Sequence, residues 1–232
     1  VFAGVYLLVG ILYIASLITL RFVNIPLPNE EERRSGGRPL LQIMRQPLFI
    51  VAALGGVVGY MTMSMLMAST PLAMQDVGHN FFDTAQVIQW HVFAMFAPAF
   101  FTGHLIRRFG TLTVMFAGTV LLAVCVAVNL AGVNLAHFWI GGIMLGVGWC
   151  FLFVGATSLV TETYTPSEKA KTQGANDFIV FGVVACSALL SGVLHELVGW
   201  QVMNYAVVPF LTIVLFTLFV MVRLRARAAA DA

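Results

Sequence analysis

The placement of lysine and arginine constrains this chain more than any other feature of its sequence. Seven long apolar stretches run along the chain, at residues 1–22, 48–68, 85–106, 112–131, 138–160, 176–197 and 201–222. The 12 basic residues lie in or at the edge of the first, third and fifth gaps between these stretches, or after the last stretch. The other three gaps hold none. Since lysine and arginine are enriched in loops that stay in the cytoplasm, this alternation predicts seven membrane spans and their orientation.

The four basic groups define the predicted cytoplasmic side of a cell (inner) membrane. They are Arg33, Arg34, Arg38 and Arg45 with Arg21 at the edge of their gap, then Arg107 and Arg108, then Lys169 and Lys171, and finally Arg223, Arg225 and Arg227. The N-terminus of the chain is therefore expected outside and its C-terminus in the cytoplasm.

The composition supports a membrane protein made of helices. Hydrophobic residues make up 60% of the chain, charged residues only 9%, and the mean hydropathy is +0.94. A helix needs about 20 apolar residues to cross the hydrocarbon core. Backbone groups cannot bond to water there, so a span is a helix or part of a closed barrel. Because strict apolar–polar alternation is absent, we expect an all-α membrane protein with seven transmembrane helices.

Several classes of function are disfavoured. The motifs H-E-x-x-H, G-x-S-x-G, C-x-x-C and the Walker sequence are missing, so we expect no enzyme, no cofactor and no metal site. The net charge of +2 is spread over four loops, which argues against nucleic acid as a partner. The three cysteines all lie in apolar stretches and suggest no disulfide framework. The expected partners are the lipid bilayer and a small-molecule substrate.

The last six stretches divide into two triplets, 48–131 and 138–222, which run in opposite directions because three is odd. The first helix of each triplet carries a glycine cluster, at 55–59 and at 141–148. Glycine-interrupted helices at matching places in inverted repeats indicate a transporter's binding region. Close helix packing through small residues explains such clusters equally well. A second local signal, Thr165-Pro166-Ser167-Glu168, predicts that the sixth stretch begins as a helix near Pro166.

Polar and aromatic residues inside the predicted spans are candidates for a substrate cavity. Asp177, next to Asn176, is an acid about 16 Å along its helix, where it could carry a proton, bind substrate, or pair with Arg107 or Lys171. His91 could titrate near neutral pH or serve as a packing residue. The full candidate set is Tyr60, Gln89, His91, Trp149, Phe153, Asn176 and Asp177.

The stretch from Gly103 to Gly110, which reads GHLIRRFG, resembles the loop signature G-x-L-x-D-R-x-G of the major facilitator superfamily. Gly103, Leu105, Arg108 and Gly110 match this signature. Arg107 stands where the signature has Asp, so the role of that Asp cannot be carried over.

The resemblance extends to the whole chain, because one helix, a long charged loop and six helices are similar to helix six, the central loop and helices seven to twelve of this superfamily. It implies a last helix of a missing N-terminal half at 1–23, a cytoplasmic central loop at 24–46, a six-helix half built as a 3+3 inverted repeat at 47–223, and a cytoplasmic tail at 224–232. The chain is accordingly expected to be part of a longer protein. A missing six-helix half would be its partner.

The resemblance implies a secondary active transporter of a small organic solute, with proton coupling as an open possibility. The segment 164–178 is similar to a bacterial branch of uncharacterised or vitamin-type carriers, for which riboflavin is a candidate solute. Two alternatives remain: a seven-helix receptor, although D-R-Y and N-P-x-x-Y are missing, and a non-transporting scaffold subunit.

Overall fold

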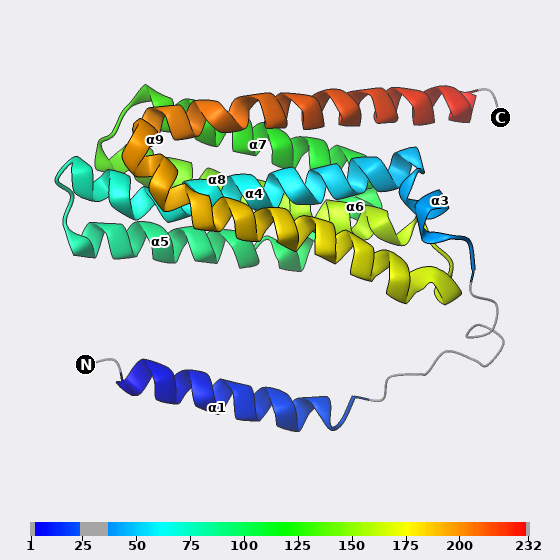
Figure 1. Ribbon diagram of the computed structural model, residues 1–232, viewed down its shortest axis with the longest axis horizontal. Coiled ribbons are helices and arrows are strands. Elements are labelled where there is room, and N and C mark those ends of the chain that lie inside the picture. Colours follow the sequence, from blue (N-terminus) through cyan, green and yellow to red (C-terminus); the bar gives the residue numbers. More distant parts are fainter. Residues whose placement is uncertain (1–2, 24–36, 231–232) are drawn as a thin grey trace. The chain divides into compact units, whose positions relative to one another are not determined.

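A computed structural model describes residues 3–23 and 37–230. The chain divides into two compact units, Val1–Gly36 and Gly37–Ala232, and each is described by itself. The first unit contains helix α1 (Ala3–Leu20). The second contains α3 (Leu40–Met44), α4 (Pro47–Asp76), α5 (Phe81–Phe96), α6 (Ala99–Phe109), α7 (Thr111–Ala131), α8 (Leu135–Thr161), the 3-10 turn η1 (Pro166–Glu168) and α9 (Lys169–Ala230). The described part of the chain is thus all-helical (Figure 1).

Each of the seven apolar stretches falls on a helix, but two of the predicted boundaries differ. Stretch 85–106 is divided into α5 and α6, because Pro98 has no N–H to donate to the carbonyl of Ala94. The last two stretches form one long α9 that turns back at Gly199, where the backbone leaves helical geometry with φ 74° and ψ 174°.

Within the described residues, length and composition single out four helical segments as able to cross a membrane. They are Pro47–Asp76, Thr111–Ala131, Leu135–Thr161 and the doubled-back Pro166–Arg225, with Tyr6–Leu20 as a shorter apolar helix. The difference from seven stretches comes from the shortness of α1, the break at Pro98 and the joining of two stretches in α9.

Helix α8 lies at the centre of the second unit and packs against α4, α5 and α7. Its glycines allow close contact. A methyl group added at Gly146 would lie 2.7 Å from the carbonyl oxygen of His91, and one added at Gly148 would lie 3.0 Å from that of Gly118. On α4, Gly59 meets the side chain of Leu152 in the same way. Both predicted glycine clusters therefore serve close helix packing in this structure.

The helices of the second unit run back and forth between two ends (Figure 1). The α4–α5 and α7–α8 connections and the turn inside α9 lie at one end, and α3, η1 and the C-terminal end of α9 lie at the other. The basic residues described in this unit belong to segments at the second end: 38–45, 107–108, 169–171 and 223–227.

An ion-pair network fixes the segment before α4 to the loop after α8. Glu168, 1% exposed, accepts hydrogen bonds from the backbone N–H of Arg38 at 2.6 Å and from its guanidinium at 2.7 and 2.9 Å. The same carboxylate accepts the backbone N–H of Thr165 at 2.9 Å, which completes a capping box. The helix start predicted near Pro166 is therefore confirmed, and Glu168 has a second role that joins distant segments.

Candidate functional site

An aromatic cluster brings together three of the predicted site residues. Trp149 and Phe153 lie one turn apart on α8, and their rings stack with centroids 5.1 Å apart and planes 11° apart. Tyr60 of α4 meets both rings edge-on, with centroids at 5.5 and 5.2 Å. Such offset and edge-to-face pairs are the arrangements that aromatic quadrupoles favour. We call Tyr60, Trp149, Phe153 and Phe181 the aromatic cluster.

Phe181 of α9 is the fourth member of this cluster, and its ring is partly exposed at the surface of the unit. Its ring centroid lies 5.6 Å from that of Tyr60, and the residue is 48% exposed. Trp149, by contrast, is 7% exposed, and its indole N–H is buried without a hydrogen-bond partner in the described part of the chain. The cluster therefore has an exposed aromatic edge and an unused buried donor.

Asp177 lies one helical turn before Phe181, so the two share a face of α9. Asp177 is exposed, whereas Asn176 is 4% exposed and donates a 3.4 Å hydrogen bond to the Asp177 carboxylate. Among the described residues, Asp177 forms no ion pair, so the pairing with Arg107 or Lys171 considered above is not formed. The acid lies instead beside the exposed edge of the aromatic cluster.

His91 and Gln89 do not join the cluster. His91 is buried on α5, and its Nδ1 lies 2.9 Å from the carbonyl oxygen of Gly142 on α8. Its Nε2 is buried without a partner in the described chain. This arrangement fits the expectation that His91 is a packing residue, although its Nε2 makes no hydrogen bond in the described chain. Gln89 is exposed on the surface of α5.

The loop signature lies at the junction of α6 and α7. Gly110 has φ +85° and ψ 151° and ends α6 directly before α7 begins, a conformation that side-chain-bearing residues avoid. The guanidinium of Arg108 lies 5.3 Å from the ring centroid of Phe109. Gly103 and Leu105 lie on α6, and Gly103 has open space where a side chain would be. Only Gly110 has a clear structural reason for its residue type.

The sequence reasoning missed Phe181, although a signal was available. Phe181 follows Asp177 by four residues, which is the spacing that places two residues on one helix face. A separate hollow of about 550 Å³ lies between α4 and α5, lined by residues that include Gln75, His79 and Thr84. None of the predicted site residues lines it.

Comparison with known proteins decides the family. The model of the Major Facilitator Superfamily matches residues 53–231, which is most of the chain. The chain belongs to the major facilitator superfamily. The resemblance that rested on residues 103–110 is thereby confirmed, and the family is one of membrane transporters, not of enzymes.

Two relatives of this superfamily member carry transporter names. The chain is 42% identical over 231 residues to the riboflavin transporter RfnT of Brucella anthropi, a match that covers 99% of the chain and 58% of the relative. It is 30% identical over 206 residues to the uncharacterized MFS-type transporter YddS of Bacillus subtilis, covering 83% of the chain and 47% of the relative. The chain thus spans about half the length of these curated relatives.

Proposed function

We propose that this chain is the C-terminal portion of a secondary active carrier that moves a flat, ring-containing organic solute of the riboflavin type. In this proposal the helices form seven spans, the last six as a 3+3 inverted repeat, with the N-terminus of the chain outside and the basic end of the second unit in the cytoplasm. The solute pathway would lie between this six-helix half and a partner half.

The aromatic cluster is the observation that carries the proposal. Its stacked pair, Trp149 and Phe153, and its edge-on Tyr60 come from two helices, and Phe181 adds an exposed ring from a third. A fused heteroaromatic ring can stack on or meet such rings edge-on, and each ring contact contributes about 0.5–1.5 kcal/mol beyond its buried area. The buried indole N–H of Trp149 offers a hydrogen-bond donor for a ring carbonyl or nitrogen.

The 42% identity to a riboflavin transporter supports this solute class. Riboflavin is a flat tricyclic ring that carries carbonyl groups and a polar chain, so it needs both aromatic contact and hydrogen-bond donors. The cluster provides the first. The Trp149 indole N–H and the Asn176 amide of α9 are hydrogen-bond donors, and the Asp177 carboxylate can accept from an N–H or hydroxyl group of the solute.

The test is uptake of labelled riboflavin by the full-length carrier reconstituted in vesicles. Trp149→Phe keeps a ring in the core but removes the indole N–H and part of the stacking surface. We expect KM to rise about ten-fold, which corresponds to about 1.4 kcal/mol of lost solute binding, with kcat little changed.

Trp90→Phe is the matched control, because Trp90 lies on α5 and contacts Phe93 and Trp139 rather than the cluster. Its uptake should equal that of wild type. Equal KM values for the Trp149 and Trp90 variants would overturn the assignment of the cluster as the solute site. Absence of any uptake by the wild-type carrier would instead favour another solute or a non-transporting subunit.

A further inference from the structure

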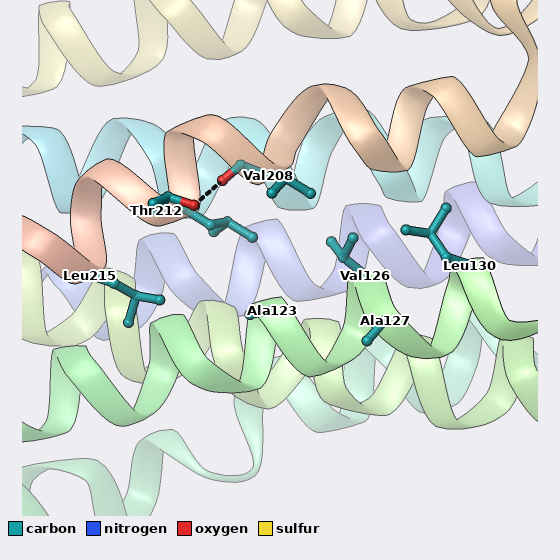
Figure 2. Close-up of a pocket in the computed structure, with 8 residues that line it drawn as sticks. Ala123, Val126, Ala127, Leu130, Val208, Thr212 and Leu215 are labelled. Carbon is teal, nitrogen blue, oxygen red and sulfur yellow. Dashed lines mark hydrogen bonds between the residues drawn. The ribbon is translucent and has the colours of Figure 1, made fainter.

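A second concave surface lies along the seam between α7 and α9, away from the residues of the aromatic cluster. One hollow of about 240 Å³ is lined from α7 by residues that include Ala123 and Ala127, and from α9 by residues that include Val208 and Leu215 (Figure 2). A second hollow of about 170 Å³ follows the same two helices toward the basic end, lined by Thr113, Phe116, Phe219 and Val222.

Both hollows are lined by α7 and by the second stretch of α9, which run in opposite directions along each other, so we treat the two hollows as one track. From Thr113 to Leu130 the track extends over roughly 26 Å of helix axis at 1.5 Å per residue. That length approaches the thickness of a bilayer's hydrocarbon core, about 30 Å. We call this track the α7–α9 seam.

The lining of the seam admits only an apolar occupant at its centre. Of the described residues that line the larger hollow, Thr212 alone has a polar side chain, and its hydroxyl already donates a 2.9 Å hydrogen bond to the carbonyl of Val208 (Figure 2). A polar solute would lose its hydrogen bonds to water here without replacement, which is unfavourable for each polar group buried. A hydrocarbon chain meets no such cost.

The seam ends at a group of arginines. Arg223 follows Val222 directly. Its guanidinium lies 5.1 Å from the ring centroid of Phe219, and both Val222 and Phe219 line the smaller hollow. Arg225 pairs with Glu162 at 2.8 Å, and Arg227 is exposed one turn after Arg223. Positive charge therefore remains at the mouth of an apolar track, as in basic pockets between helices that bind anionic lipid headgroups.

We propose that the α7–α9 seam binds an anionic phospholipid, with one acyl chain in the hollows and the headgroup phosphate at Arg223 and Arg227. The lipid would come from the leaflet at the basic end of the second unit, which is the cytoplasmic leaflet in the proposed topology. The lipid site includes no residue of the aromatic cluster and needs no bound solute. A failure of the proposed solute site would therefore leave the lipid proposal unaffected.

The test is lipid retention by the full-length carrier, measured by native mass spectrometry from micelles that contain phosphatidylglycerol or phosphatidylcholine. Wild type should retain phosphatidylglycerol in preference to phosphatidylcholine. Arg223→Gln and Arg227→Gln should each weaken phosphatidylglycerol binding about five-fold, since a basic residue near the membrane surface contributes about 1 kcal/mol. Arg45→Gln, an exposed arginine at the same end, is the control and should leave binding unchanged.

Ala127→Leu tests the acyl-chain part of the site by filling the larger hollow. It should reduce retention of phosphatidylglycerol, whereas Ala117→Leu, also exposed on α7 but outside both hollows, should not. Equal retention of the two phospholipids by wild type would overturn the proposal, and so would equal binding by the Arg223, Arg227 and Arg45 variants. If the partner half covers the seam, wild type should retain neither phospholipid, and that result would also contradict the proposal.

Discussion

At the scale of single residues, Glu168 illustrates how one side chain joins two distant parts of the fold. Hydrogen bonds from the Arg38 guanidinium, then from the Thr165 backbone, hold the pKa of Glu168 well below its ordinary value of 4.5, although burial opposes them. The same pairing raises the pKa of Arg38. Because the folded pKa of Glu168 is lowered, the ionised carboxylate stabilises the fold above about pH 4.5, and this contribution is lost as the pH falls toward the lower folded value.

We therefore expect Glu168→Gln to lower the Tm of the purified carrier at pH 7. The difference from wild type should hold from pH 7 to about pH 5 and shrink below the ordinary glutamate pKa, because Glu168 of the unfolded wild-type chain then binds a proton while the folded carboxylate stays ionised. Arg38→Ala should also lower Tm, since it leaves a buried carboxylate without its cation. Arg45→Ala, which removes an exposed arginine nearby, should not. A difference between wild type and Glu168→Gln that stays constant down to pH 3 would contradict this account.

Asp177 provides a second prediction at this scale, and it concerns transport. The carboxylate is exposed one turn from Phe181 and forms no ion pair among the described residues, so it is available to a proton or to a solute. Under the proposed function, we expect Asp177→Asn to reduce riboflavin uptake by the full-length protein about ten-fold or more at matched expression, and to flatten its pH dependence. The exposed acid Glu196, replaced by Gln, is the control. Wild-type uptake with an unchanged pH profile in Asp177→Asn would exclude a role for this acid.

The residues of the cluster show what a sequence can and cannot predict at this scale. Tyr60, Trp149 and Phe153 are candidates because they are aromatic residues inside predicted spans, and the structure brings them together. Thr165 and Glu168 were recognised as a cap because that pattern lies within one turn. The bond from Arg38 crosses 130 positions of sequence and has no local signature, so only the fold reveals it.

At the scale of elements, apolar length predicted where helices lie but not where they break. Hydropathy is averaged over many residues, so it does not detect a break that a single residue causes. At Pro98 the cause is the missing N–H, and at Gly199 it is the positive φ. Glycine clusters were open to two interpretations because the sequence does not show which helix each glycine faces. In the structure, a side chain at Gly59 would meet Leu152 and one at Gly146 would meet α5, as the packing interpretation expects.

Gly199 allows a prediction about an element boundary. With φ +74° and ψ 174° it occupies a region that is nearly restricted to glycine, and a side chain there costs about 1–3 kcal/mol. We expect Gly199→Ala to lower Tm, by roughly 2–4 °C per kcal/mol for a chain of this size. Gly192→Ala lies in the helical part of α9 with open space around it, so it should leave Tm unchanged or raise it slightly. Intrinsic tryptophan fluorescence on heating measures both, and equal Tm values would contradict the argument.

At the scale of the whole molecule, the alternation of basic and non-basic gaps predicts more than helix number. The structure gathers the described basic residues of the second unit at one end, together with α3, η1 and the end of α9, and it places the three gaps without Lys or Arg at the other. Hydropathy alone could not have shown this grouping, because it carries no information on which loops share an end. From the positive-inside rule we propose that the basic end lies in the cytoplasm.

That assignment can be tested with two cysteines, one at each end of the second unit. In a full-length carrier whose Cys125, Cys150 and Cys186 are replaced by alanine, His79→Cys lies just after α4 and Ala170→Cys lies at the start of α9. A membrane-impermeant maleimide added to intact cells should label position 79 and leave position 170 unlabelled. Position 170 should react only after the membrane is opened, and total labelling in detergent controls for burial of either thiol. Because neighbouring helices alternate in direction, the reverse pattern would invert every span of this half at once and would place the arginine end of the α7–α9 seam in the outer leaflet.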